Sequence, residues 1–322
     1  MACKSRTCKF LVSFFISLLM PVHCFAQSSQ APFIPTHDRL IIIGQQQDAI
    51  DAYISNTGLV PGGFMIYTSI QNMEGLDQPA DHGAGIINAQ YYIHSYPHAA
   101  IQLALYMVGA IDDTLQGKYD DNILKLATWM KNTDCPIYFR IGYEFDLPQN
   151  GYDPKEYQQV YRYIVDHLRA LGVKNVAYVW HTACLTEGKG NYLDWYPGDD
   201  YVDWFAVSLF NSMQIATARQ FFAIARDHNK QLMIAESTPA GDVSTRSKME
   251  WYKHYFDFIN DEDIKVVCYI NCNWNSYQLF QSLNWGDSRV ENDPEIKDMW
   301  VEEMNKGYLQ YSLDLYKQLT SS

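Results

Sequence analysis

The feature that most constrains the fold is the alternation of eight apolar segments with segments of helical periodicity. Most of the apolar segments are hydrophobic nearly throughout, which is typical of strands in a parallel sheet that is covered on both faces. The predicted strands are RLIIIG (39–44), GGFMIYT (62–68), AIQLALYMV (100–108), PIYFRIGYE (136–144), NVAYVWHT (175–182), VDWFAVSLF (202–210), KQLMIAES (230–237) and IKVVCYINC (264–272).

The segments between the strands carry helix signals, most clearly at residues 153–172. Asp153 is a favourable N-cap, Pro154 suits the first helical position, and Gly172 suits the C-terminal stop. Apolar residues recur there at intervals of three and four, which gives the predicted helix one apolar face. Further helices are predicted at 47–56, 84–95, 120–132, 216–228 and 246–260, and near 294–318. The segment GKGNYLDWYPGDD (188–200), after the fifth strand, is the poorest helix of the set.

Eight strands that alternate with helices, without a linker or low-complexity tract, predict an α/β fold of one domain, the (β/α)₈ TIM barrel. A doubly wound open sheet is the alternative. It is disfavoured because no GxGxxG or phosphate-loop glycine pattern follows an early strand.

The first 26 residues have the three parts of a secretory signal peptide. MACKSRTCK carries three positive charges and no acid, FLVSFFISLLMPV is apolar, and HCFA offers a small residue before a cut. We therefore expect cleavage after Ala26, a secreted protein and a catalytic domain over residues 27–322. The apolar run is too short to be a membrane span, and no other stretch is long and apolar enough.

Charge and cysteine content exclude several functions. The signal segment holds three of the 24 basic residues, so the remainder has 21 basic against 37 acidic residues, a net charge of about −16. So acidic a chain repels nucleic acid and anionic lipid. Four cysteines remain after cleavage (Cys135, Cys184, Cys268 and Cys272), and their pairing is left open because four cysteines allow three full pairings. Without a CxxC or HExxH motif, no metal site is predicted.

Two glutamates occupy the ends of predicted strands. Glu144 ends the fourth strand and Glu236 lies near the end of the seventh. A lone glutamate at such a position is more often structural or solvated, but burying an unpaired carboxylate is costly, so chance is a poor explanation for two of them. In a (β/α)₈ barrel, however, the carboxyl ends of all strands meet at one face, where active sites form. The pair therefore favours a catalytic function.

Other side chains are predicted to reach the same face. Arg140 shares a strand face with Glu144 by the two-residue period, and a guanidinium there would hold a carboxylate ionised. Trp274 continues the inward face of the eighth strand and would offer an indole for stacking on a sugar. His181 ends the fifth strand, where binding and plain hydrogen bonding are equally expected. The acidic cluster GDDYVD (198–203) precedes the sixth strand and is interpreted as solvated.

These residues together resemble the clan of retaining (β/α)₈ glycoside hydrolases. Within that clan, RIGYE (140–144) is similar to the R-x-x-H-E pattern of glycoside hydrolase family 26, and the resemblance covers nearly the whole chain after residue 26. It implies that Glu144 is the general acid/base and that Glu236, in IAES, is the nucleophile. It also places Trp274 beneath the sugar at the cleavage point. WGDSRV (285–290) is similar to the family's region after strand eight.

The chain departs from the family pattern at two positions. Tyr143 replaces the histidine that usually precedes the acid/base, and FDLPQNGYD follows in place of the longer M-N-G-x-W-Y-P-W tail of the mannanases. Phe210 ends strand six, where the clan usually has a tyrosine that hydrogen-bonds the nucleophile. These departures favour a substrate other than mannan. The segments LIIIGQQQDAIDAYI and PGGFMIYTSIQNMEGLDQPADHGAGIINAQYY are similar to the β-1,3-xylanase branch.

The resemblance implies a secreted endo-β-glycanase that hydrolyses a cell-wall polysaccharide, most specifically β-1,3-xylan, by double displacement with two glutamates. No cofactor is required, and Tyr143, His181 and Phe210 join Arg140 and Trp274 as expected substrate-binding residues. A β-mannanase or other β-glycanase of the same family is the alternative. A carbohydrate-binding barrel without catalysis and a metal-dependent barrel hydrolase are weaker hypotheses, since both glutamates are present and only His181 would suit a metal. Oligomeric state is not predicted.

Overall fold

The computed structural model describes residues 31–185, 191–241 and 244–320. The predicted signal segment lies outside these residues, and the described ones belong to one compact unit, Ala31–Ser322. No helix among them is both long and apolar enough to span a bilayer.

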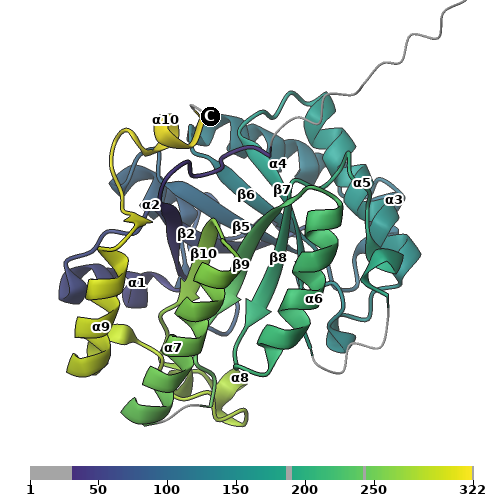
Figure 1. Cartoon of the computed structure of the whole chain (residues 1–322). Helices are drawn as coiled ribbons and strands as arrows, with labels where there is room; N and C mark the ends of the chain where they lie inside the picture. Colours follow the sequence, from purple (N-terminus) through teal and green to yellow (C-terminus); the bar gives the residue numbers. More distant parts are fainter. Residues whose placement is uncertain (1–30, 186–190, 242–243, 321–322) are drawn as a thin grey trace, which may run out of the picture. The chain divides into compact units, whose positions relative to one another are not determined.

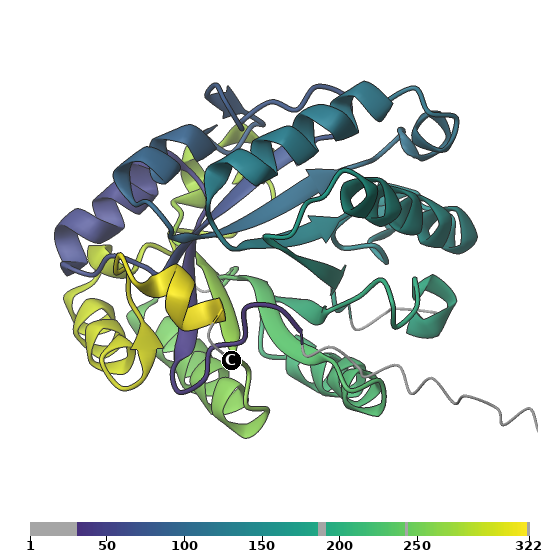
Figure 2. The same ribbon diagram turned by 90° about the horizontal axis from the view of Figure 1, so that it is seen from above.

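Eight parallel strands close into a barrel, which confirms the predicted fold (Figures 1 and 2). Each strand pairs with the next along the ring, and pairing of β1 with β10 completes the closure. The strands are β1 (Arg39–Gly44), β2 (Gly63–Ser69), β5 (Ala100–Tyr106), β6 (Ile137–Ile141), β7 (Val176–Thr182), β8 (Trp204–Leu209), β9 (Gln231–Ser237) and β10 (Val266–Ile270).

Helices surround the ring, as Figure 2 shows from above. They are α1 (Gln47–Thr57), α2 (Ala89–Ser95), α3 (Ile111–Leu115), α4 (Asp120–Thr133), α5 (Pro154–Ala170), α6 (Gln214–Asp227), α7 (Thr245–Asp261) and α9 (Pro294–Met304), with the short α8 (Gln278–Gln281) and α10 (Leu315–Thr320). The capping signals of α5 act as predicted. The Asp153 carboxylate accepts the N–H groups of Lys155 and Glu156, and Gly172 has the left-handed φ of +76° that ends the helix.

Two segments differ from the sequence prediction, and a third agrees with it. Residues 84–95 form a helix only from Ala89, because a small hairpin of β3 (Ala80–Asp81) and β4 (Ile86–Ile87) precedes it. The region 294–318 is divided into α9, β11 (Tyr308–Leu309) and α10, since β11 adds a short pairing to β1. Between β7 and β8 the described residues form only a 3₁₀ turn at Tyr192–Trp195, as the weak helix signal indicated.

The barrel interior is filled by side chains and is closed at the amino ends of the strands. Alternate residues of each strand point inward and form one apolar cluster, while the intervening residues pack against the helices. Phe33 and Leu315 close the amino end, where Tyr138 donates a hydrogen bond to the Phe33 carbonyl over 2.5 Å. Solvent access is thereby directed to the opposite face.

An irregularity in the pairing of β8 with β9 determines where Glu236 points. Val207 pairs with Ile234, but the next residue, Ser208, pairs with Glu236, so β9 contains one extra residue. Met233 and Ala235 face the interior, and strict alternation would turn Glu236 outward. The bulge changes the phase and turns Glu236 into the cavity at the carboxyl face.

Glu144 is positioned by a turn rather than by a strand. The strand β6 ends at Ile141, and both Gly142 (φ +54°) and Glu144 (φ +53°) have left-handed backbone conformations. Such a conformation is unfavourable for glutamate and persists where neighbouring contacts fix it. Here Phe145 stacks on Trp180 with ring centroids 4.7 Å apart, and the Phe145 N–H donates to the His181 carbonyl. The face-sharing with Arg140 that the strand period predicted is therefore replaced by a turn that packs on β7.

Candidate active site

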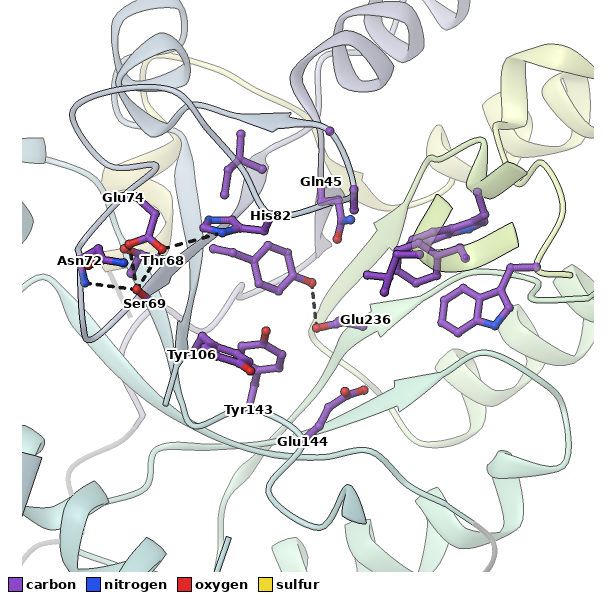
Figure 3. Close-up of a pocket in the computed structure, with 18 of the residues that line it drawn as sticks. Gln45, Thr68, Ser69, Asn72, Glu74, His82, Tyr106, Tyr143, Glu144 and Glu236 are labelled. Atoms are coloured by element: carbon purple, nitrogen blue, oxygen red, sulfur yellow. Dashed lines mark hydrogen bonds and ion pairs between the residues drawn. The ribbon is translucent and has the colours of Figure 1, made fainter. Parts of the chain in front are cut away.

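A cavity of about 700 Å³ opens at the carboxyl ends of the strands, and Glu144 and Glu236 both line it (Figure 3). On one side of the two glutamates lie polar residues from the end of β2 and the segment after it: Ser69, Asn72, Glu74 and His82. Four aromatic residues also line the cavity and pack against one another: Phe210, Trp274, Phe280 and Trp285. The cavity is therefore lined by a polar set and an aromatic set of residues, together with the two glutamates.

Glu236 is fixed by two donors to one oxygen. Arg140 Nη1 lies 2.5 Å from Glu236 Oε1, and the Tyr67 hydroxyl donates to the same atom over 2.9 Å. Burial and the nearby Glu236 charge raise the pKa of Tyr67 well above its ordinary value, so this phenol stays a donor. The contacts orient Glu236 as a carboxylate and leave Oε2 free of any described hydrogen bond.

Arg140 is a fully buried cation held on several sides. The rings of Tyr67 and Tyr143 lie 5.4 and 5.2 Å from its guanidinium carbon. Nη1 also contacts His181 Nδ1 at 3.2 Å, and Nη2 contacts the sulfur of Met65 at 3.3 Å. Burial works against the charge, but the paired Glu236 raises the pKa of Arg140 above its ordinary value, so the guanidinium is protonated.

Glu144 has a different environment. The Ser208 hydroxyl donates to Glu144 Oε1 over 2.6 Å, and no described cation contacts this carboxyl group. Burial and the negative charge of Glu236 raise the pKa of Glu144 to about 8, against the smaller opposing effects of Ser208 and Arg140. One carboxyl group is thus ion-paired and the other is kept protonated near neutral pH, which is the division of roles that acid/base catalysis with a nucleophile requires.

The structure brings most of the predicted site residues to this cavity. Tyr143, Phe210 and Trp274 line it, and Trp274 donates its indole N–H to Ser288 Oγ over 3.1 Å, which fixes the ring. Arg140 does not line the cavity itself but contacts Tyr67, Tyr143 and Glu236, which do. His181 does not line the cavity: it is buried behind Arg140, with Nε2 3.0 Å from Ser208 Oγ. Its predicted contact with substrate is therefore replaced by contacts with two protein side chains.

Two residues that touch the glutamates were not among the sequence candidates. Tyr67 lies on the inward face of β2 with Met65, and it supplies the hydroxyl that a strand-six tyrosine supplies in the clan, where this chain has Phe210. The sequence feature that could have indicated Tyr67 is its place one residue before the end of a predicted strand. No sequence feature indicated Ser208, because a serine inside an apolar strand is ordinary. Among the described residues no group of three His, Cys, Asp or Glu side chains is placed to hold a metal ion.

Comparison with known proteins identifies the family. The model of glycosyl hydrolase family 26 matches residues 98–281, which include both glutamates. The chain is 32% identical to a β-1,3-xylanase of Alcaligenes sp. over 91% of its own length and 69% of that protein. It is equally identical to the β-1,3-xylanase TXYA of Vibrio sp., over 91% and 71% of the two lengths. The chain belongs to glycosyl hydrolase family 26.

Solved structures agree with the fold of this family 26 glycoside hydrolase. A family 26 β-mannanase from Bacteroides ovatus superposes with a TM-score of 0.62 at 16% identity, covering 87% of this chain and 93% of the other. GH26C from Muricauda sp. superposes with a TM-score of 0.60 at 17% identity, covering 90% of each. At such identities the likeness concerns the barrel itself.

The hydroxyl of Tyr67 is expected to contribute to glycoside hydrolysis through Glu236. Tyr67→Phe keeps the ring beside Arg140 but removes one donor from the carboxylate. Hydrogen bonds to charged groups are worth about 1.5–3 kcal/mol, so kcat/KM should fall about 10- to 100-fold. Tyr163→Phe on α5 is the matched control, because it also removes a hydroxyl bonded to a carboxylate, that of Asp120 at 2.6 Å, far from the cavity. Equal kinetics for Tyr67→Phe and the parent would contradict the assignment.

The pH dependence of folding stability should reveal the protonated Glu144. Because its folded pKa is raised from 4.5 to about 8, the native protein retains a proton that the unfolded chain releases above pH 4.5. The free energy of unfolding therefore falls as pH rises from about 5 to about 8, and above that pH the titration of Glu144 no longer changes it. Glu144→Gln has no such loss, so its advantage over the parent in urea denaturation should grow across that range. A constant difference between the two proteins from pH 5 to pH 9 would refute the raised pKa.

Proposed function

We propose that this family 26 enzyme is a retaining endo-β-1,3-xylanase in which Glu144 is the acid/base and Glu236 the nucleophile. The observation that carries the proposal is the shared cavity with two carboxyl groups in opposite states, one protonated and one paired with Arg140. Retaining hydrolysis needs this combination, because one group donates a proton while the other attacks carbon.

The first step transfers one proton and forms one bond to carbon. Glu144 gives its proton to the glycosidic oxygen, and the bond from that oxygen to the anomeric carbon breaks. A Glu236 carboxylate oxygen forms an ester with the same carbon, and Oε2 suits the attack because Arg140 and Tyr67 occupy Oε1. Glu144, now a carboxylate, then takes a proton from water. The hydroxide formed displaces Glu236 and leaves the sugar with its original configuration.

Two observations support β-1,3-xylan as substrate. The relatives of highest identity named above are both β-1,3-xylanases, whereas the mannanase structure shares only the fold at 16% identity. The turn after Glu144 also lacks the mannanase tail: Phe145 is buried against Trp180, and the chain continues into a 3₁₀ turn at Pro148–Asn150. The polar set and the aromatic set line the same cavity as the two glutamates, so side chains suited to bind sugars surround the bond that is cut, which supports a polysaccharide substrate.

A digest of four polysaccharides tests the substrate. We expect β-1,3-xylan to give a ladder of short oligosaccharides at early times, with much slower release from β-1,4-xylan, mannan and mixed-linkage glucan, as read by product chromatography. Release of a single sugar from chain ends would contradict endo action. Strong hydrolysis of mannan without xylan products would favour the β-mannanase alternative, and binding without any hydrolysis would favour a carbohydrate-binding barrel.

Azide rescue separates the roles of the two glutamates. In Glu236→Ala, azide can occupy the vacated space and attack the anomeric carbon directly, so the glycosyl azide should have inverted configuration. In Glu144→Ala, a substrate with an acidic phenol as leaving group should still form the ester with Glu236. Azide would then displace that ester and give the retained configuration. The anomeric coupling in the NMR spectrum distinguishes the products, and the same anomer from both variants would overturn the assignment.

We also propose that the protein is exported and loses residues 1–26. The support is the sequence pattern of a basic start, an apolar run and the small residue Ala26. Mass spectrometry of protein from the culture medium should find Gln27 as the first residue, and a secreted chain that begins at Met1 would contradict the proposal.

A further inference from the structure

A chain of hydrogen bonds runs among inward-facing side chains of the barrel from Glu236 to Glu144. Arg140 Nη1 lies 2.5 Å from Glu236 Oε1 and 3.2 Å from His181 Nδ1. His181 Nε2 lies 3.0 Å from Ser208 Oγ, which in turn lies 2.6 Å from Glu144 Oε1. The three intermediate side chains, which are at most 1% exposed, are shielded from water. The two carboxyl groups are therefore connected by protein groups alone.

The staggered register of the strands places these hydrogen-bonded side chains next to one another. On β6 and β7, Arg140 pairs with Val179, and His181 is the next inward residue after Val179. On β7 and β8, His181 pairs with Ala206, and Ser208 is the next inward residue after that. Each member thus lies two residues nearer the carboxyl end than the one before. Because the register of a closed barrel is staggered, these hydrogen bonds lead to the cavity, where Ser208 contacts Glu144.

The direction of every bond is determined by Arg140. A guanidinium has donors and no acceptor, so His181 Nδ1 must accept. Burial, together with the nearby Arg140 charge, lowers the pKa of His181 well below its ordinary value, so the ring is neutral and its single proton lies on Nε2. That proton is donated to Ser208 Oγ, and the serine in turn donates its own proton to Glu144 Oε1. Oε1 is therefore held as an acceptor.

We propose that His181 and Ser208 are positioning residues that keep the catalytic proton of Glu144 on Oε2, the oxygen left open to the leaving group. The inference rests on the proposed role of Glu144 as acid. A proton on Oε1 would face the hydroxyl proton of Ser208, and Ser208 could turn away only by leaving that proton without an acceptor in a buried site. The acid is thus delivered in one orientation before substrate binds.

The same contact favours the transition state. As the proton leaves Oε2, negative charge develops on the carboxyl group, and the bond from Ser208 to Oε1 becomes a stronger, charge-assisted bond. An interaction that strengthens during the reaction lowers the barrier, whereas one of constant strength does not. Burial and Glu236 raise the pKa of Glu144, and the Ser208 bond opposes that rise. Without Ser208 the acid would hold its proton too tightly.

Several charged or titratable groups surround Glu144 and enter any test based on pH. Glu236 on β9 and Asp146 in the same turn raise its pKa, while Arg140 on β6 lowers it. Tyr67 and Tyr143 are protonated phenols, since burial and the Glu236 charge raise their pKa values well above the ordinary one. A Ser208 variant leaves all of these groups in place, so a change in titration reports the lost hydroxyl.

The first experiment measures the proton of Glu144 without substrate. Infrared titration follows the carboxyl C=O band that disappears in Glu144→Gln. In Ser208→Ala the pKa of Glu144 should rise above the parent value, and Ser208→Thr, which keeps the hydroxyl, should return it toward the parent. Ser237→Ala is the matched control, because Ser237 is a buried serine of β9 whose hydroxyl bonds Tyr255 and the Cys268 carbonyl. An unchanged pKa in Ser208→Ala would overturn the inference.

The second experiment uses kcat/KM with two leaving groups. Ser208→Ala should lower kcat/KM on polysaccharide about 10- to 100-fold, the range for a hydrogen bond to a charged group. The effect should be below about 3-fold on an aryl glycoside of an acidic phenol, whose departure needs little protonation. The alkaline limb of the pH profile should move to higher pH. An equal loss on both substrates with an unmoved limb would indicate a merely structural serine and overturn the inference.

These readouts separate the inference from the proposed function. If the protein hydrolyses no polysaccharide, the infrared titration still tests the Ser208 contact, and a shifted pKa would support it. If the enzyme is active but Ser208→Ala titrates like the parent, the function stands and the inference fails. Thermal melting verifies that each variant is folded. Should Ser208→Ala melt at low temperature, Ser208→Cys replaces it, because a thiol is a weak donor of similar size. The pKa of Glu144 in Ser208→Cys is expected to lie between those of the parent and Ser208→Ala.

Discussion

The ion pair between Arg140 and Glu236 is the interaction on which the rest of the site depends. Its guanidinium has no exposed surface, and removing an ion from water costs several kcal/mol unless partners replace the water. The carboxylate of Glu236, the faces of Tyr67 and Tyr143 and the sulfur of Met65 supply those partners. The pair therefore requires a closed barrel with residues from β2, β6 and β9 in contact.

The charges of this pair also account for the states of its neighbours. The negative charge of Glu236 acts with burial to keep Glu144 protonated, while the positive charge of Arg140 acts with burial to keep His181 neutral. A neutral histidine can relay a directed hydrogen bond, and a protonated glutamate can act as an acid. The arrangement therefore places a protonated carboxyl group and an ion-paired carboxylate within one cavity.

Two departures from regular strand geometry complete the arrangement. The bulge between β8 and β9 turns Glu236 inward, and the left-handed turn after β6 presents Glu144 from beyond the strand end. Both are unfavourable for an isolated segment, and both are fixed by neighbours. Phe145 and Asp146 anchor the turn to β7, where Asp146 accepts hydrogen bonds from Thr182 and Ala183. Rigid anchoring of this kind limits how far the carboxyl groups can move during a reaction.

The amino-acid sequence by itself determined the architecture, because apolar strands and amphipathic helices recur with periods that only a few folds can bury. It also indicated Glu144, Glu236 and Arg140, since parallel strands bring their carboxyl ends to one face. Tertiary structure alone decided the bulge that points Glu236 inward, the donation from Tyr67 in place of a strand-six tyrosine, and the contacts of His181 with Arg140 and Ser208. Those features depend on the register and side-chain contacts between separate strands, which no local pattern encodes.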